Sequence, residues 1–90
     1  MLVIARAYKD KPLRRTVVGD GPGVLFVHNQ DASDADGTVD KSGVGFPKDC
    51  VFPFDSTVFQ RLQAEWEAGN GAELAELWAR MVPVGELADA

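Results

Sequence analysis

Two consecutive stretches in the second half of the chain show helical hydrophobic periodicity, so each has one apolar face to bury. In both stretches apolar side chains recur at spacings of three and four, which places them on one side of a helix. They are Val58, Phe59, Leu62 and Trp66 in the first stretch, and Leu74, Leu77, Trp78 and Met81 in the second. Any fold of this chain must therefore supply an apolar surface against which two short helices pack.

The ends of these two helices carry capping signals. Asp55, or the serine after it, can cap the first helix, and a glycine follows its predicted end near residue 68. Asn70 with Glu73 three residues later resembles a capping box, and Pro83 is predicted to end the second helix. Because the connection between the helices is short, the sequence predicts a helical hairpin over residues 55–82.

The first 29 residues predict a β-meander. Three runs rich in strand-forming residues are separated by two turn signals, KDKP and DGPG. The runs cover residues 2–8, 13–18 and 24–29. Connections this short favour antiparallel pairing of consecutive strands. None of the three runs alternates cleanly between apolar and polar residues, so the sequence does not assign their faces.

Residues 44–54 form an aromatic segment in which prolines limit strand formation. Pro47 and Pro53 rule out a regular central strand across the whole segment, and a short strand from about Cys50 to Phe52 is predicted. The fold class is therefore α+β, with a small antiparallel β-meander of three to four strands packed against a C-terminal helical hairpin. The single domain, 1–90, comprises the β-meander (1–29), an acidic loop (30–43), the extended aromatic segment (44–54) and the helical hairpin (55–82).

Charge is distributed unevenly along the chain, whose formal net charge is −5. Residues 1–29 hold five basic and two acidic residues, a net charge of +3, and residues 30–90 hold four basic and twelve acidic residues, a net charge of −8. We expect the two segments either to attract each other within one fold or to favour self-association. The negative total argues against nucleic-acid binding. A small basic cluster is predicted to be a solvated strand face; it consists of Lys9, Lys11, Arg14 and Arg15.

The motif DASDADGTVD at residues 31–40 resembles a calcium loop in part. With Gly37 at the sixth position of the EF-hand pattern, aspartates occupy the third and fifth positions as required. The first position is Ala32 and the twelfth is Gly43, so the two ligands that close the cage are absent. The sequence therefore predicts a solvated acidic loop and no metal site.

No catalytic constellation is visible in the sequence. His28 is the single histidine, and nothing in the sequence completes a triad around it. Cys50 is the single cysteine and stands beside Val51 and Phe52, so burial as a small hydrophobe is expected, although a nearby Lys48 would lower its pKa. The sequence assigns no catalytic residue, no cofactor-binding residue and no cofactor, and it favours a protein that is not an enzyme.

Two further properties bear on location. No apolar run approaches the roughly 20 residues that span a bilayer, so no membrane association is predicted. A single cysteine cannot form an internal disulfide, which is typical of a reducing compartment and predicts a cytoplasmic protein.

Trp66 and Trp78 each lie on the apolar stripe of a helix, so a core position is the first interpretation. Two tryptophans and five phenylalanines are many for the core of so small a domain, so a contact surface is the open alternative for some of them. The candidate interface or pocket residues are Phe46, Val51, Phe52, Phe54, Trp66 and Trp78. The first hypothesis is a non-enzymatic interaction protein that self-associates, with a homodimer as the first expectation, and that binds another protein. The second is a small-molecule-binding protein with an aromatic pocket between sheet and helices, and a small enzyme ranks last.

The runs VGFPKDCVFPFD and FQRLQAEWEAGNGAELAELW resemble small uncharacterised bacterial proteins of the kind carried on mobile integron gene cassettes. The resemblance covers residues 44–81. It implies a compact, stand-alone α+β protein with a tendency to form oligomers. The resemblance implies no known reaction and no functional residue.

Overall fold

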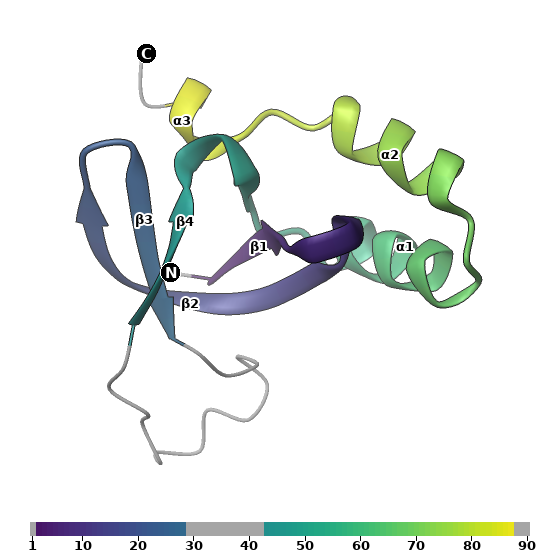
Figure 1. Ribbon diagram of the computed structural model, residues 1–90, viewed down its shortest axis with the longest axis horizontal. Helices are drawn as coiled ribbons and strands as arrows, with labels where there is room; N and C mark the ends of the chain where they lie inside the picture. Colours follow the sequence, from purple (N-terminus) through teal and green to yellow (C-terminus); the bar gives the residue numbers. More distant parts are fainter. Residues whose placement is uncertain (1, 29–42, 88–90) are drawn as a thin grey trace.

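The computed structural model describes residues 2–28 and 43–87, and its α+β fold confirms the predicted class (Figure 1). Within these residues, five strands form one antiparallel sheet and two longer helices form a hairpin beside it. The strands are β1 (Leu2–Arg6), β2 (Pro12–Gly21), β3 (Val24–His28), β4 (Gly43–Pro47) and β5 (Val51–Pro53). The helices are α1 (Ser56–Glu67), α2 (Gly71–Ala79) and the short α3 (Val84–Leu87), with 3₁₀ turns η1 (Tyr8–Asp10) and η3 (Lys48–Cys50).

The strands lie in the order β4–β3–β2–β1–β5, and each neighbouring pair is antiparallel. The predicted meander is confirmed for β1 to β3, and β5 returns to pair with β1. The described part of the sheet has five strands rather than three to four. The additional strand β4 contains two glycines, which are rare in strands, so strand propensities do not predict it. The turn η3 separates β4 from β5, which confirms that no regular strand crosses residues 44–54.

Strand β1 lies between β2 and β5, and both of its faces are buried. Ile4 belongs to a core that also contains Phe52 and side chains of both hairpin helices. Its neighbour Val3 belongs to a second core, which it shares with Val51 and two residues of β3. Side chains alternate along a strand, so β1 and β5 each contribute to both cores. This pair of strands therefore separates one core from the other.

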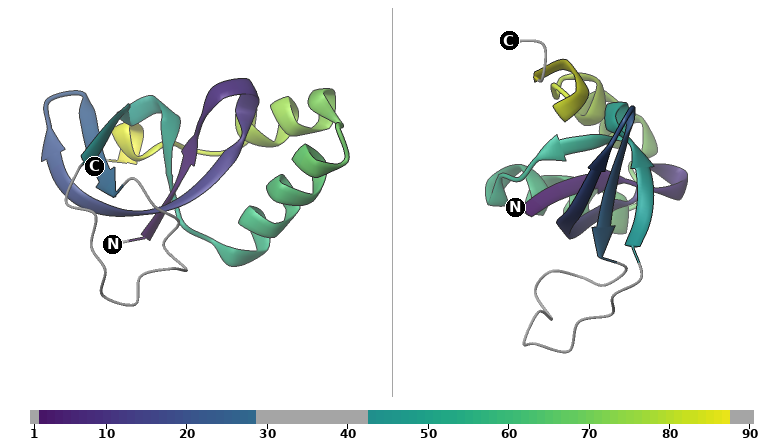
Figure 2. Two further views of the ribbon diagram at one scale, coloured as in Figure 1. Left: turned by 60° about the horizontal axis from the view of Figure 1, so that its bottom comes forward. Right: turned by 90° about the vertical axis from the view of Figure 1, so that its left-hand side faces the viewer.

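Helices α1 and α2 form the predicted hairpin, at the end of the sheet away from β3 and β4 (Figure 2). The Asp55 carboxylate accepts hydrogen bonds from the backbone N–H groups of Thr57 and Val58, at 2.9 and 3.1 Å. The predicted cap of α1 is thereby confirmed. Gly69 follows the helix with a φ of 75°, in the left-handed region that glycine adopts at low cost.

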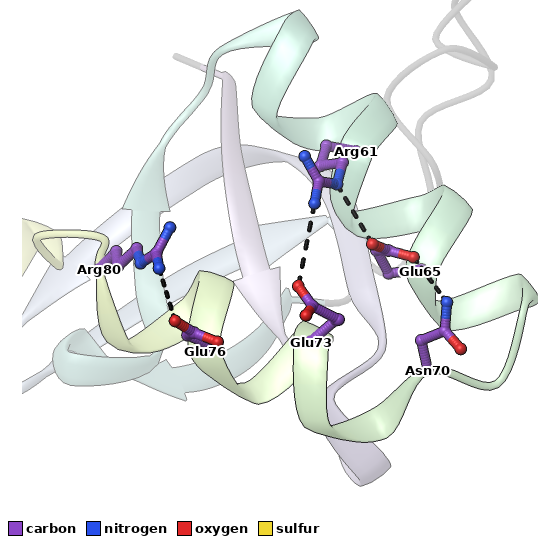
Figure 3. A network of polar contacts seen from close by, with 6 residues as sticks. All are labelled: Arg61, Glu65, Asn70, Glu73, Glu76 and Arg80. Carbon is purple, nitrogen blue, oxygen red and sulfur yellow. Dashed lines mark hydrogen bonds and ion pairs between the residues drawn. The ribbon is translucent and has the colours of Figure 1, made fainter.

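The second helix differs from its prediction at both ends. The Asn70 side-chain oxygen accepts no capping hydrogen bond, and the side-chain amide donates to the Glu65 carboxylate of α1 at 2.9 Å (Figure 3). The predicted capping box with Glu73 therefore does not form. Helix α2 also ends earlier than predicted, at Ala79, and the chain after Pro83 forms α3, which contacts η3 and β5.

Trp78 of α2 joins the hairpin to the first turn of the chain. Its side chain is 1% exposed, and its indole Nε1–H donates to the backbone carbonyl of Asp10 in η1 at 2.9 Å. Its ring lies 5.1 Å from the ring of Phe52, centroid to centroid, and the Arg6 guanidinium lies 5.6 Å from the indole centroid. An aromatic pair of this kind adds about 0.5–1.5 kcal/mol beyond the burial of its surface. One side chain thus fixes α2, β5 and η1 relative to one another.

Replacing Trp78 by phenylalanine is expected to lower the free energy of unfolding by about 2–4 kcal/mol, because the change leaves a void and deprives the Asp10 carbonyl of its donor. Trp66→Phe is the matched control: that side chain is 37% exposed, and the expected loss is below about 1 kcal/mol. Urea unfolding followed by circular dichroism measures both variants. Equal losses would contradict the role assigned to Trp78.

Candidate interaction surfaces

Three of the six predicted contact residues are core residues. Val51 is 0% exposed, Phe52 is 3% exposed and Trp78 is 1% exposed. As strand β5 pairs with β1, whose side chains are buried on both faces, its alternating side chains fill the two cores in place of a contact surface. The structure therefore places these three side chains in the core, and of the three Phe52 also borders a surface groove.

The other three predicted residues keep some exposure. Phe46 packs against the second core, and Phe54 packs against the first, with its ring 5.9 Å from that of Phe59. Trp66 is 37% exposed. Between the sheet and the hairpin, Trp78 and Ile4 belong to the packed core, and an open groove at the margin of this junction is lined by side chains of both β5 and α1.

The described surface includes hollows at this junction and at the turn of the hairpin. One is an open apolar groove of about 270 Å³ near the end of α2, lined by Phe52, Pro53, Asp55, Val58, Met81 and Val82. The other, of about 150 Å³, lies at the turn of the hairpin. Both are smaller than the roughly 300–1,000 Å³ of ordinary small-molecule sites, so neither favours the small-molecule hypothesis.

An uncovered part of the sheet presents an exposed aromatic ring. Leu25 and Val27 of β3 face the second core, so Phe26 between them faces the opposite side, as Ile4 does in β1. The hairpin covers that side around Ile4, whereas Phe26 is 41% exposed and the nearby Val18 is 47% exposed. Figures 1 and 2 show β3 and β4 at the end of the molecule opposite the hairpin.

Glycines on both neighbouring strands allow the Phe26 ring to lie against the sheet. A Cβ added to Gly45 of β4 would meet the ring at 3.3 Å and Val24 at 3.1 Å, and one added to Gly21 of β2 would meet the ring at 3.2 Å. Any larger residue would push the ring away from the backbone. We define the bare sheet face by six residues, which are Val18, Gly19, Gly21, Phe26, Gly43 and Gly45.

A second surface lies where η1 meets the hairpin. Tyr8 is 85% exposed, and the Lys9 ammonium lies 5.6 Å from its ring centroid. The Lys11 ammonium lies 4.9 Å from the ring centroid of Trp66, within the range of a cation–π contact. We call Tyr8, Lys9, Lys11 and Trp66 the basic corner. The sequence placed its two lysines on a solvated strand face, but the turn η1 brings them beside the helices instead.

The backbone of the basic corner is held in a strained form. Lys9 and Asp10 are consecutive non-glycine residues with φ of 58° and 66°, and each such residue costs on the order of 1–3 kcal/mol. Contacts on both sides offset this cost. Arg6 Nε donates to the Asp10 carboxylate at 2.8 Å, and the Trp78 indole donates to the Asp10 carbonyl. The geometry of η1 is therefore fixed by its contacts, although its sequence contains no glycine.

The polar side chains of the hairpin interact mainly with one another, as Figure 3 shows. Glu65 accepts hydrogen bonds from Asn70 at 2.9 Å and from Arg61 at 3.3 Å. The hydrogen bond from Asn70, and then the contact with Arg61, holds the pKa of the Glu65 carboxyl below its usual value. Arg61 also lies 3.9 Å from Glu73, and Arg80 pairs with the glutamate one turn before it. Because these ion pairs are exposed, they contribute little to the free energy of unfolding. They do pair both arginines of the hairpin with glutamates of the same hairpin.

Cys50 is half-buried at the end of η3, and the chemistry around it disfavours a nucleophile. Burial raises the pKa of the Cys50 thiol, and the Asp49 carboxylate raises it further by repulsion and by a hydrogen bond. The predicted effect of Lys48 is not observed, because that ammonium pairs with Asp20. His28 lies at the end of β3, as predicted.

Metal binding and membrane crossing can be compared with the described residues. Residues 2–28 and 43–87 contain no group of three or more histidine, cysteine, aspartate or glutamate residues placed to hold a metal ion. The motif at residues 31–40 lies outside the described residues. None of the helices that the structure describes is long and apolar enough to cross a membrane.

Comparisons with protein-family models, with curated proteins and with solved structures found no match to this chain. The resemblance to bacterial gene-cassette proteins therefore stays a prediction. The surfaces must be interpreted from their own geometry.

Substitutions at Lys9 test the strain in η1. A β-branched residue tolerates positive φ poorly, so Lys9→Val is expected to lower the free energy of unfolding by about 1–2 kcal/mol, whereas Lys9→Gly is expected to maintain or raise it. Lys11 provides the control, because its φ is −65°. There the order should reverse, with Lys11→Gly less stable than Lys11→Val by about 0.5–1 kcal/mol. Urea unfolding of the four variants checks the ranking, and the same order at both positions would contradict it.

The raised pKa of Cys50 predicts slow alkylation. At about pH 8 the thiol should react with iodoacetamide more slowly in the folded protein than in urea, because a smaller fraction is thiolate. Asp49→Asn should speed the reaction by removing one of the causes. The folded thiol keeps its proton to a higher pH, so its contribution to stability is complete below the unfolded pKa and is lost as pH rises through the folded pKa. Faster alkylation of the folded protein would contradict this assignment.

Proposed function

We propose that this protein is a non-enzymatic cytoplasmic interaction module that self-associates through the bare sheet face. The observation that carries the proposal is the incomplete cover of one side of the sheet. The hairpin buries the part around Ile4, and the part around Phe26 presents an aromatic ring to solvent. Large exposed apolar groups that cluster in this way are typical of contact surfaces.

The absence of charge on the bare sheet face supports a second copy of this chain as its partner. None of its six residues is charged, whereas the chain as a whole carries a net charge of −5. Two copies repel each other at long range, so they are best matched through a surface that adds no like charges at contact. In a twofold-symmetric dimer each Phe26 would contact the equivalent face of the other copy.

The shape of the bare sheet face supports the same partner. Gly19 and Gly21 lie on one side of Phe26, and Gly43 and Gly45 lie on the other, so the ring is flanked by low-lying backbone. An approaching ring from a second copy would meet this backbone without obstruction by other side chains. Interfaces place aromatic anchors in such surroundings.

Phe26→Glu tests self-association. It places a carboxylate at the centre of the face and, in a symmetric dimer, brings two like charges together, so the dimer dissociation constant should rise at least about tenfold. Sedimentation equilibrium at about 1–100 μM measures this shift, with circular dichroism to confirm folding. Phe26 also packs on the backbone, so a second variant leaves its ring in place. This variant is Val18→Lys, at the margin of the same face.

Val82→Glu is the matched control, since this valine is 49% exposed but borders the apolar groove. It should leave the assembly state unchanged. A wild-type protein that stays monomeric to about 100 μM would refute the proposal. An equal effect of Val82→Glu would also refute the assignment to the bare sheet face.

A further inference from the structure

We propose that the basic corner, formed by Tyr8, Lys9, Lys11 and Trp66, binds an acidic peptide segment of a partner protein. This surface is distinct from the bare sheet face, and the inference does not depend on self-association. Lysine ammonium groups would pair with carboxylates of the peptide, and the two aromatic rings would contact its apolar side chains.

The charges at the basic corner leave two ammonium groups available. Among the described residues, Lys9 and Lys11 contact aromatic rings and form no ion pair with a carboxylate. The nearest acidic groups are already used, because Asp10 is paired with Arg6, and Glu65 accepts from Arg61 and Asn70. Two cations without a carboxylate partner therefore stand on a chain whose total charge is negative. Anionic groups are the ligands that complement them.

The shape of the corner fits one side chain of an extended ligand. The hollow of about 150 Å³ lies between Lys9 and the hairpin and is lined by Trp66 and Leu74, together with Glu65, whose carboxylate is paired with Arg61 and Asn70. Gly69 and Gly71 border it, and a Cβ added to either would meet no other atom within 4 Å. Its volume is about half the roughly 300 Å³ lower limit for small-molecule sites. A single aliphatic side chain held by flanking carboxylates matches this space better than a cofactor does.

The turn η1 presents the corner in a fixed form. Asp10 is held through both its carboxylate and its carbonyl, and the backbone N–H groups of Asp10 and Lys11 donate to the carbonyls of Ala7 and Tyr8 at 3.0 and 3.3 Å. Since the turn is already ordered, a ligand would lose less free energy to ordering this surface. Strained, well-supported backbone of this kind is found preferentially at binding sites. Tyr8 is 85% exposed, so packing within the described fold does not explain the position of its ring.

An acidic peptide fits these observations better than a nucleic acid. A nucleic-acid surface requires a row of basic residues along the phosphate backbone, and its affinity rises with each phosphate that is neutralised. The basic corner offers two lysines beside two aromatic rings, and the total charge of −5 repels a long polyanion. A short segment with two carboxylates needs only these two contacts.

The two tryptophans make the test specific. In ¹H–¹⁵N spectra of the full chain, the indole signal of Trp66 reports on the basic corner, and the signal of Trp78, whose N–H is bound to Asp10, serves as the internal reference. Trp66→Phe assigns the two signals. The probe is an acetylated hexapeptide with two glutamates flanking a leucine, and the matched peptide carries glutamines instead. We expect saturable movement of the Trp66 signal, with a dissociation constant at least about tenfold lower for the glutamate peptide.

Matched variants separate the corner from general charge effects. Lys9→Gln with Lys11→Gln should weaken binding of the glutamate peptide at least about tenfold. The control, Lys48→Gln with Arg80→Gln, removes the same charge at two residues that do not belong to the corner and are paired with carboxylates, and it should change the constant less than about twofold. Equal binding of both peptides, equal losses in the two double variants, or no saturable shift to about 10 mM would overturn the proposal. Tighter binding of an oligothymidylate of about twelve nucleotides would overturn it in favour of a nucleic-acid site.

Discussion

The hydrogen bond from the Trp78 indole to the Asp10 carbonyl is the contact on which the described structure depends most. It joins a residue of the last long helix to one of the first turn, 68 positions apart in the chain. The same indole packs on Phe52 and lies beside Arg6, whose guanidinium holds the Asp10 carboxylate. The positive φ values of η1 are tolerable because this contact and the Arg6 pair repay their cost. Trp78 therefore sets both the position of the hairpin and the form of the basic corner.

The two-sided burial of β1 explains why one sheet can carry both a packed hairpin and an open surface. Its alternating side chains divide the apolar residues between two cores. The hairpin closes only the core around Ile4, while the second core is enclosed by β2, β3, β5 and the short α3. Among residues 2–28 and 43–87, no helix covers the part of the sheet around Phe26, which is 41% exposed.

The sequence predicts helices and strands well where hydrophobic periodicity or a capping residue defines them. It predicts the interaction surfaces poorly. Local spacing determines both helices. The apolar stripe with Leu62 and the cap at Asp55 predicted α1, and the apolar stripe with Trp78 predicted α2. Burial of Val51 and Phe52 could not be derived, since it depends on β5 pairing with a strand some fifty residues earlier. The basic corner was hidden for the same reason: its lysines and Trp66 meet only through tertiary packing. Glycines at alternate positions beside Phe26 were the one local signal of the bare sheet face.

The two proposed surfaces differ in the range over which they act, and this difference assigns them separate roles. Ammonium groups at the basic corner attract carboxylates over roughly 8–10 Å at physiological ionic strength, so that corner can select and orient a partner before contact. The bare sheet face has no charge and gains free energy only when water is displaced from Phe26 and its neighbours. The surfaces lie on different elements, η1 with the hairpin in one case and the far strands in the other. Self-association through one therefore leaves the other open, and a dimer would present two basic corners to an acidic partner, which raises effective affinity without any new contact.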